Sequence, residues 1–172
     1  MIAEYLIEPL DKHHDRAAFA CGSEPLDRYL RHQASQDVRR RLAAVFVLRT
    51  VASPLVLGYY TLSMSAIEST SLPSELTRRL PRYPVLPAAL IGRLAVDQRY
   101  RGQRNGERLL LDALYRCLRI SAEMATMAVL VDAKDDQARQ FYERYGFQRF
   151  ADRENRLFLP MKTIERLFSD QE

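Results

Sequence analysis

Cysteine is scarce in this chain of 172 residues, which contains only Cys21 and Cys117. Small secreted scaffolds without a large core depend on several disulfides, and this composition excludes that class. Cys117 falls in an apolar helical stripe, and we expect both cysteines to be thiols. A chain of this length can bury well over half of the surface that its unfolded form exposes, so we expect one ordinary domain over residues 1–172.

Long apolar runs are also absent. No uninterrupted apolar stretch approaches the ~20 residues that a helix needs to cross a bilayer. Residues 1–10 carry Glu4 and Glu8 among their apolar side chains, and they lack the basic start and the long apolar run of a secretory signal. The sequence therefore predicts a soluble, cytoplasmic protein with no membrane partner.

Lysine is rare too, although the chain is basic overall. Lys12, Lys134 and Lys162 are the only lysines among 26 basic side chains, and the formal net charge is +4. Arginine suits phosphate oxygens better than lysine does, because its planar guanidinium can donate two parallel hydrogen bonds. The excess of arginine is typical of a protein with a polyanionic ligand, but an arginine-rich coding sequence with a solvated surface explains it equally well.

The N-terminal half of the chain predicts a strand, two helical segments and a hairpin. In chain order these elements are expected over Tyr5–Ile7, His13–Cys21, Pro25–Arg41, Ala43–Thr50 and Leu55–Ile67. The last two are rich in β-branched and aromatic residues, and a proline-containing turn separates them. The polar residues 69–83, punctuated by prolines, predict a short helix followed by a loop.

The C-terminal half alternates strands and helices. Val85–Val96 is an almost continuous apolar run, as expected of a strand buried on both faces. Residues 97–103 break this pattern, and a helix with one apolar face follows. That face contains Leu110, Ala113, Leu114, Cys117 and Leu118. A strand, a helix and two short strands are then expected over Met127–Val131, Asp135–Tyr145, Phe147–Phe150 and Arg156–Met161. This order predicts an α/β (α+β) fold with a mixed, mainly antiparallel sheet and helices on both faces.

The junction between the buried strand and the next helix has the features of an anion site. It reads Arg101-Gly102-Gln103-Arg104-Asn105-Gly106. Backbone N–H groups at a helix N-terminus lack intrahelical acceptors and lie at the positive end of the helix dipole. Taken alone, a loop of this kind is more often only a tight turn.

A second candidate lies on the helix expected over Asp135–Tyr145. Ala138, Phe141, Tyr142 and Tyr145 form a stripe at three- and four-residue spacing. By pattern alone, this stripe favours Tyr142 as a core residue.

Together the two segments resemble the acetyl-CoA core of the GNAT superfamily of N-acetyltransferases. The resemblance covers Leu94–Leu110 and Asp135–Phe147. In that superfamily the loop has Gln or Arg, any two residues, Gly, any residue, and then Gly or Ala. Arg101 and Gly106 match the first and last positions, whereas Arg104 replaces the glycine. An arginine there either obstructs the close approach of the backbone to the pyrophosphate or adds a phosphate contact.

The resemblance implies a GNAT fold of six or seven strands with a splayed central strand pair, acetyl-CoA as co-substrate and no metal. It also implies direct attack of a primary amine on the thioester, with Tyr142 as the general acid that protonates the departing thiolate. The residues implied in acetyl-CoA binding are Leu94, Ala95, Val96, Arg101, Gly102, Gln103, Arg104, Asn105, Gly106, Glu107 and Asp135, and Arg108 would add charge.

Four further segments narrow the resemblance to the acetyltransferase toxins of bacterial type II toxin–antitoxin modules. They are Ala20–Ser23, Gly58–Ser63, Gly92–Asp97 and Arg156–Met161. Members of that group acetylate the α-amino group of aminoacyl-tRNA and are neutralised by a ribbon-helix-helix antitoxin. The resemblance implies this activity and these partners here, and it allows a homodimer. The arginines implied in tRNA binding are Arg39, Arg40, Arg41, Arg78, Arg79, Arg82 and Arg93.

Two other functions stay open at this point. One is a non-catalytic acyl-CoA-binding protein that keeps the fold, with Arg104 as the change that ended turnover. The other is an acetyltransferase for a small amine or a protein N-terminus. Acetyl transfer to charged tRNA, measured beside free amino acids and peptides, separates these functions from the toxin activity.

The sequence contains few other residues that suggest catalysis or metal binding. His13 and His14 are expected on a helix, facing different directions, and they have no Cys or His partner at metal-ligand spacing. We therefore expect a solvated pair and no metal site. Asp132 and Asp135 are interpreted as a strand-end residue and a helix N-cap and not as a catalytic pair.

Overall fold

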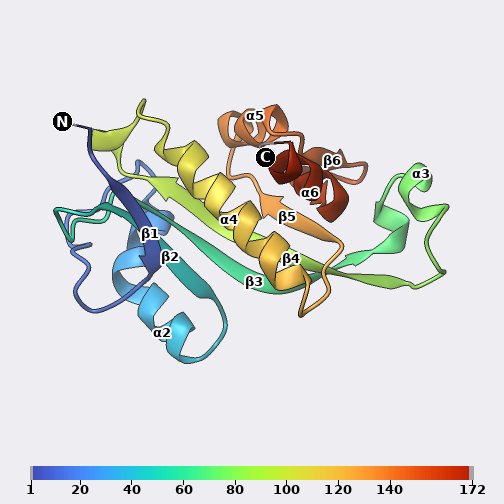
Figure 1. Cartoon of the computed structure of the whole chain (residues 1–172), viewed down its shortest axis with the longest axis horizontal. Coiled ribbons are helices and arrows are strands. Elements are labelled where there is room, and N and C mark those ends of the chain that lie inside the picture. The colour runs from blue at the N-terminus through green and yellow to red at the C-terminus, as the bar shows by residue number, and fades with distance from the viewer. Residues whose placement is uncertain (1, 171–172) are drawn as a thin grey trace. The chain divides into compact units, whose positions relative to one another are not determined.

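The computed structural model describes residues 2–170, and its strands form a seven-stranded sheet (Figure 1). The strands are β1 (Tyr5–Pro9), β2 (Ala44–Thr50), β3 (Gly58–Glu68), β4 (Val85–Val96), β5 (Ala128–Asp132), β6 (Gln148–Phe150) and β7 (Arg153–Pro160). Their order is β1-β2-β3-β4-β5-β7-β6. β4 and β5 are parallel, and β1–β2, β2–β3, β5–β7 and β6–β7 are antiparallel pairs. The mixed, mainly antiparallel sheet predicted from the sequence is confirmed.

The helices are short apart from α4. They are α1 (Glu24–Arg28), α2 (Ala34–Arg39), α3 (Ser74–Thr77), α4 (Asn105–Ser121), α5 (Asp136–Arg144) and α6 (Met161–Ser169). A π-helical turn η1 (Tyr29–Gln33) joins α1 to α2, and the 3-10 turns are η2 (Ser69–Ser71) and η3 (Gln98–Tyr100). α4 buries the apolar face that its sequence predicts, including Leu110, Ala113, Leu114 and Cys117.

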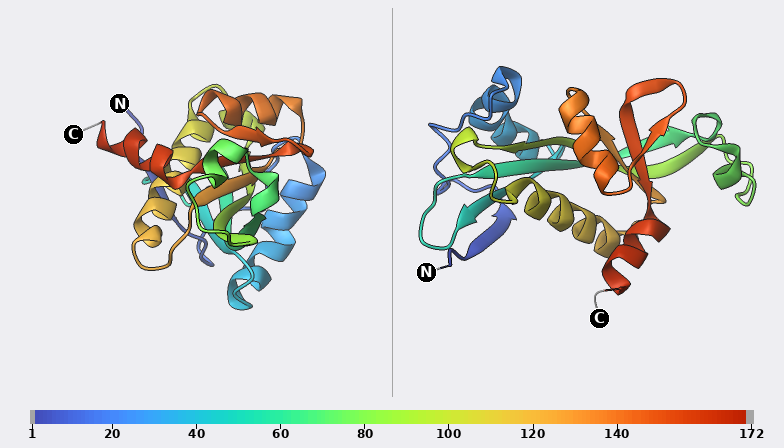
Figure 2. Two further views of the ribbon diagram at one scale, coloured as in Figure 1. Left: turned by 90° about the vertical axis from the view of Figure 1, so that its right-hand side faces the viewer. Right: turned by 90° about the horizontal axis from the view of Figure 1, so that it is seen from above.

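The chain divides into two compact groups of residues, each built from separated segments. The first group comprises the chain up to Ser63 together with Gly92–Ala113. α2 contacts β2 and lies beside it in Figure 1, and Figure 2 gives two further views of the ribbon. The buried core of this group contains Phe19, Cys21, Tyr29, Leu30, Ala34, Val45, Val47, Val56, Tyr59 and Ala95. The core therefore ties the N-terminal segment to the β2–β3 hairpin.

The second group comprises Met64–Ile91 together with the chain from Leu114 onward. β5 is its central strand: it pairs with β4 through Ala89–Ile91 and Val129–Val131, and with β7 along its whole length. The buried core contains Ile67, Leu72, Leu86, Ala88, Ala128, Leu130, Phe150 and Phe158. Because β3 and β4 each contribute residues to both groups, neither group is a continuous piece of sequence.

The most regular hydrophobic patterns are confirmed. The apolar run Val85–Val96 is β4 with unchanged bounds. β2 and β3 form the predicted antiparallel hairpin, in which Phe46 lies opposite Tyr60 with ring centroids 5.2 Å apart. Such aromatic cross-strand pairs stabilise a sheet and help to fix its register.

The helix expected over His13–Cys21 is wrong, because this segment consists of turns and an isolated bridge. The amide of Asp15 donates to the Pro54 carbonyl at 2.9 Å, and the Asp15 carbonyl accepts from the amide of Val56 at 2.9 Å. The backbone groups of Asp15 are thus paired with a distant loop instead of with a helical turn. Burial of Phe19 and Cys21 in the core favours this extended course over a helix.

α6 was not predicted. The strand expected over Arg156–Met161 is the second part of β7, which starts earlier at Arg153 and ends at Pro160, and Met161 is the first residue of α6. The amide of Met161 donates to the Met127 carbonyl at 2.8 Å, and Ile164 is fully buried. Docking of Ile164 thus stabilises a short helix whose intrinsic propensity is modest.

No helix within residues 2–170 is both long and apolar enough to cross a membrane. Cys21 and Cys117 are buried thiols outside any disulfide, as the sequence predicts.

Candidate active site

The loop that follows β4 is anchored by Asp97, whose side chain is fully buried. Its carboxylate accepts hydrogen bonds from the amide of Arg99 at 2.9 Å, the Arg99 Nε at 3.0 Å and the amide of Ala20 at 3.2 Å. Burial raises the pKa of Asp97, but the hydrogen bonds from Arg99 and Ala20 outweigh it and keep the pKa below its usual range. Asp97 therefore fixes the start of the loop on the N-terminal segment.

Two residues of the loop have left-handed backbone conformations: Gly102 with φ 76° and Arg104 with φ 63°. This conformation costs a side-chain-bearing residue ~1–2 kcal/mol, whereas glycine adopts it freely. Arg104 stands where the GNAT pattern has glycine, so the backbone keeps the turn that a glycine favours. Within residues 2–170 the exposed Arg104 guanidinium has no hydrogen-bond or ion-pair partner.

The loop leads into the N-terminus of α4. The first helical hydrogen bond runs from the amide of Arg108 to the Arg104 carbonyl at 3.0 Å. The amides of Asn105, Gly106 and Glu107 precede it and have no acceptor within the helix. They lie at the positive end of the dipole of a 17-residue helix. The backbone geometry that the predicted anion site requires is thus present, and anion binding stays a prediction.

Side chains brace this loop from two directions. Arg108 donates to the Gln103 carbonyl at 2.6 Å and to Asn105 Oδ1 at 2.9 Å, and its guanidinium lies 4.0 Å from the ring centroid of Tyr5. Arg101 donates to the Cys21 carbonyl. Arg101 and Arg108 therefore fix the loop to other residues of the first group. Binding of acetyl-CoA by Arg101 stays a prediction.

The end of β4 lies directly before this loop. Its parallel ladder with β5 runs through Ala89–Ile91, and Leu94–Val96 lie beyond these pairs. The Ala95 carbonyl comes so close to Gly58 that a Cβ built there would lie 2.8 Å from it. Gly58 is therefore required for β3 to pack against this part of β4.

Arg93 and the arginines at the end of α2 lie in the first group. The Arg93 guanidinium stacks 3.5 Å from the ring centroid of Tyr29, whose hydroxyl donates to Asp37 at 2.8 Å. Burial and the Asp37 hydrogen bond raise the pKa of Tyr29 to about 12. Residues 39–41 are exposed, and Arg41, which follows the C-cap of α2, is left-handed with φ 58°. Arg78, Arg79 and Arg82 are exposed in the second group. Each cluster is available to an anion, and a role in tRNA binding stays a prediction.

Tyr142 lies in the second group, on α5, and is 5% exposed. Its ring centroid is 5.2 Å from that of Phe141 and 5.5 Å from that of Phe147. Burial raises the pKa of Tyr142 well above its usual value, and the charge of Asp132 adds to the rise. Within the described chain its hydroxyl has no hydrogen-bond partner. The ring is a core group, as the stripe predicts, and the hydroxyl is a protonated donor without an acceptor.

The two aspartates near Tyr142 in sequence have the structural roles predicted for them. Asp135 is the N-cap of α5 and accepts from the amide of Ala138 at 2.8 Å. Asp132 ends β5 and forms a bidentate ion pair with Arg156 at 2.8 and 2.9 Å. A role of Asp135 in acetyl-CoA binding stays a prediction.

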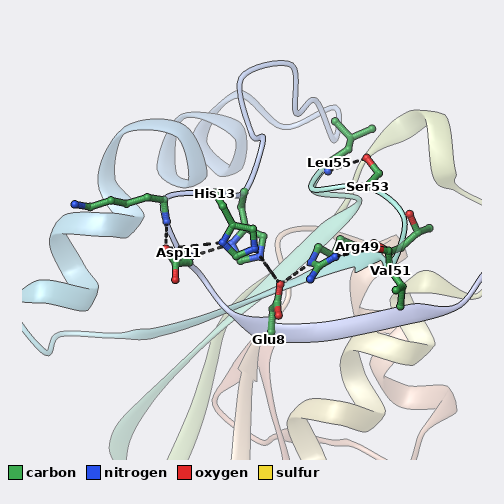
Figure 3. A network of polar contacts seen from close by, with 10 residues as sticks. Glu8, Asp11, His13, Arg49, Val51, Ser53 and Leu55 are labelled. Atoms are coloured by element: carbon green, nitrogen blue, oxygen red, sulfur yellow. Dashed lines mark hydrogen bonds and ion pairs between the residues drawn. The ribbon is translucent and has the colours of Figure 1, made fainter.

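Figure 3 shows a polar network centred on Glu8. His14 Nδ1 accepts from the amide of Asp11 at 2.9 Å, and its Nε2 lies 2.7 Å from Glu8 Oε1. Because Nδ1 is the acceptor, the proton of neutral His14 is on Nε2 and is donated to Glu8. Arg49 Nε donates to the same oxygen at 2.6 Å. The hydrogen bonds from Arg49 and His14 lower the pKa of Glu8 to about 2.

The expectation of a solvated histidine pair on a helix is therefore wrong. His14 is buried, and its ring centroid lies 4.1 Å from that of His13, which exposes 54% of its side chain. Ligand atoms of Glu8, His13 and His14 lie within 4.8 Å of one another. Since Arg49 neutralises the Glu8 carboxylate and His14 donates a hydrogen bond to the same oxygen, the cluster is a satisfied polar network that joins β1 to β2.

Comparison with known proteins identifies the class to which this site belongs. Residues 56–149 match the acetyltransferase (GNAT) domain family. The chain belongs to this family and is an acetyl-CoA-dependent N-acetyltransferase.

The relatives of the chain narrow the comparison to toxins within this family. The chain is 34% identical to a probable toxin TacT of Sinorhizobium fredii over 173 residues, which cover 96% of both chains. It is 33% identical to a tRNA-acetylating toxin of Mycobacterium tuberculosis over 156 residues, which cover 91% of this chain and 92% of the relative.

Solved structures agree with the sequence relatives. A tyrosine-to-phenylalanine mutant of KacT superposes with a TM-score of 0.91 at 30% identity, covering 96% of this chain and 99% of the other. AtaT complexed with acetyl-methionyl-tRNAfMet gives 0.89 at 32% identity, with coverage of 96% and 99%. A mutant AtaT bound to acetyl-CoA and the C-terminus of the antitoxin AtaR gives 0.82 at 29% identity, with the same coverage.

Sequence reasoning missed the residues that hold the site in place. Asp97 and Ala20 meet across 77 positions of sequence, and Arg156 meets Asp132 across 24. Such pairs leave no local pattern. The signal that could have indicated one of them is Asp97 itself, a lone acid directly after an apolar strand and before a loop.

Proposed function

We propose that this protein is a toxin that transfers the acetyl group of acetyl-CoA to the α-amino group of aminoacyl-tRNA. The likeness to a tRNA-acetylating toxin and to AtaT in complex with acetyl-methionyl-tRNAfMet supports this substrate. The observation that supports acetyl-CoA binding is the set of amides at the start of α4. They have no acceptors within the helix, and two left-handed residues, Gly102 and Arg104, lie in the loop before them.

The donor site follows from the chemistry of that loop. The amides of residues 102–107 bind the pyrophosphate of acetyl-CoA, and the helix dipole favours its charge. The unpartnered guanidinium of Arg104 lies on the same loop. The pantetheine arm runs along the backbone of Leu94–Val96, beyond the last β4–β5 pair, where main-chain donors polarise the acetyl carbonyl.

The acceptor chemistry needs little basic help from the enzyme. An α-amino group has a reference pKa near ~7.7–8.0, against ~10.4 for a lysine side chain, so a useful fraction is neutral at cytoplasmic pH. The amine attacks the thioester carbon, a C–N bond forms and the C–S bond breaks. Tyr142 donates its proton to the departing thiolate sulfur, and the proton of the attacking amine leaves to solvent.

Partners and location complete the proposal. The arginines of residues 39–41, Arg78, Arg79, Arg82 and Arg93 contact tRNA phosphates. The likeness to AtaT bound to the C-terminus of AtaR supports neutralisation by an antitoxin, for which the sequence resemblance implies a ribbon-helix-helix protein. The protein acts in the cytoplasm, where charged tRNA is found. Residues 1–172 form one GNAT domain.

A substrate panel tests the function as a whole. Radiolabelled acetyl-CoA is offered with total charged tRNA, deacylated tRNA, free amino acids and a peptide with a free N-terminus. The expected result is label on charged tRNA alone, removed when the ester is hydrolysed. Label on peptides or free amino acids would assign the protein to another acceptor, and acetyl-CoA binding without turnover would make it a non-catalytic binding protein.

A further inference from the structure

A cavity of about 120 Å³ lies in the second group of residues and is lined by residues of β3, β5, β6 and β7. Its apolar wall includes Ile67, Leu130 and Phe150, all of which belong to the buried core of this group. Its polar wall includes Glu68, Asp152 and Arg156. Its wall is therefore apolar on one side and charged on the other.

An ion pair joins the wall of the cavity to β5, the strand that precedes the helix of Tyr142. Arg156 in its wall holds Asp132 in a bidentate pair, and the two residues are directly opposite in the β5–β7 ladder. Asp132 ends β5, the strand directly before α5, and α5 carries Tyr142. Leu130 lies two positions before Asp132 on β5, so both side chains are on the same face of the sheet.

The charge of the cavity favours a cation. Asp132 neutralises Arg156, so this guanidinium contributes little net charge. Within residues 2–170 the carboxylates of Glu68 and Asp152 have no ion-pair or hydrogen-bond partner, and both line the cavity together with Arg153. Two carboxylates without partners against one guanidinium leave an excess of negative charge, which attracts a positively charged amino group as it binds.

The volume of the cavity limits the size of the amino-acid side chain that can enter with the amino group. An apolar cavity of ~150 Å³ admits a benzene ring, so a cavity of about 120 Å³ suits an aliphatic side chain better than an aromatic one. We propose that this cavity receives the aminoacyl end of the charged tRNA. The carboxylates meet its amino group, and Ile67, Leu130 and Phe150 contact an uncharged aliphatic side chain. This inference rests on the proposed function and adds the class of amino acid.

Competition between charged tRNAs tests the selectivity. Wild-type protein should acetylate leucyl- or methionyl-tRNA with a kcat/KM about 10- to 200-fold above that for phenylalanyl-tRNA, the range that apolar pockets achieve. Ile67→Ala enlarges the cavity and should bring this ratio down by roughly tenfold. Leu80→Ala removes an aliphatic side chain that lines other grooves of the same group, and it should leave the ratio unchanged. Because both kcat/KM values are measured on the same variant, their ratio does not depend on the fraction of that variant that is folded.

A binding measurement separates this inference from the function on which it rests. The probe is adenosine carrying leucine through a stable 3′-amide, titrated calorimetrically into wild-type protein and into Glu68→Gln and Asp152→Asn. Weaker binding in both variants supports the cavity even if no charged tRNA is acetylated. Turnover on charged tRNA with an unchanged ratio in Ile67→Ala, or probe binding that neither substitution weakens, would overturn it.

Discussion

The candidate site depends on single residues whose backbones are in unusual conformations. Arg104 has a φ of 63° in the loop before α4, and Arg41 has a φ of 58° at the end of α2. Each conformation costs ~1–2 kcal/mol relative to glycine, which adopts it freely. The two positions share residue type and geometry, but only one is in the proposed acetyl-CoA loop. They form a matched pair for mutation.

Arg104→Gly should raise the free energy of unfolding by about 1 kcal/mol and tighten acetyl-CoA binding, because glycine relieves the strain and lets the pyrophosphate approach the backbone. Arg41→Gly should give a similar gain in stability with unchanged acetyl-CoA affinity. Chemical denaturation and calorimetric titration measure the two quantities. Weakening of binding by ~1.5–3 kcal/mol would show instead that the guanidinium contacts phosphate. An unchanged affinity would contradict both roles.

Glu8 should control stability at acid pH. Its pKa is about 2 in the folded protein, lowered by Arg49 and His14, against ~4.3 in an unfolded chain. Its contribution is therefore complete above about pH 4.3 and is lost as the pH falls towards 2. Glu8→Gln should be less stable than wild type at neutral pH, and its unfolding free energy should change less between pH 5 and pH 2. Parallel curves for the two proteins in denaturant titrations would show that the network has no such role.

Among the elements, those with strong periodicity were predicted closely and those set by distant partners were not. β4 has the expected bounds, and α5 starts at the expected cap Asp135. The helix predicted over His13–Cys21 failed because its backbone pairs with Pro54 and Val56. The loop before α4 and the burial of Tyr142 could be inferred from local motifs. The braces Asp97 and Arg156 could not, because their partners Ala20 and Asp132 are brought close only in the folded chain.

The exposed arginines at the end of α2 and around α3 should make tRNA binding steeply dependent on salt. Removing one arginine–phosphate interaction should reduce the slope of log affinity against log salt by ~0.7–0.9. Changing residues 39–41 to Gln, or Arg78, Arg79 and Arg82 to Gln, should weaken binding and flatten the slope in filter-binding assays. Arg28→Gln, at a side chain that is 67% exposed and outside both clusters, is the control. Equal slopes in all four proteins would remove these clusters from the tRNA interface.

At the scale of the whole molecule, each compact group is assembled from two segments, and β3 and β4 run through both. We therefore expect the groups to fold together as one domain. Thermal unfolding should show one transition with equal calorimetric and van't Hoff enthalpies. Two separable transitions would contradict a single domain over residues 1–172.

The proposed toxin activity also belongs to this scale. Induction of the intact protein should arrest growth and protein synthesis. Co-expression of a ribbon-helix-helix protein whose C-terminal segment orders on the toxin should relieve the arrest. Normal growth at high expression would reject the toxin while leaving the acetyltransferase intact.

Acetyl transfer by Tyr142→Phe tests the mechanism most directly. The substitution removes only the hydroxyl and keeps the ring that packs against Phe141 and Phe147. Stability and acetyl-CoA affinity should therefore be retained. Tyr115→Phe, at an exposed tyrosine of the same group, is the control and should behave as wild type. Because general acid catalysis contributes ~10²–10⁴ in rate, transfer of labelled acetyl to charged tRNA should fall by that factor in Tyr142→Phe. Near-wild-type transfer by a stable Tyr142→Phe would show that Tyr142 is only a core residue and that the acid lies elsewhere.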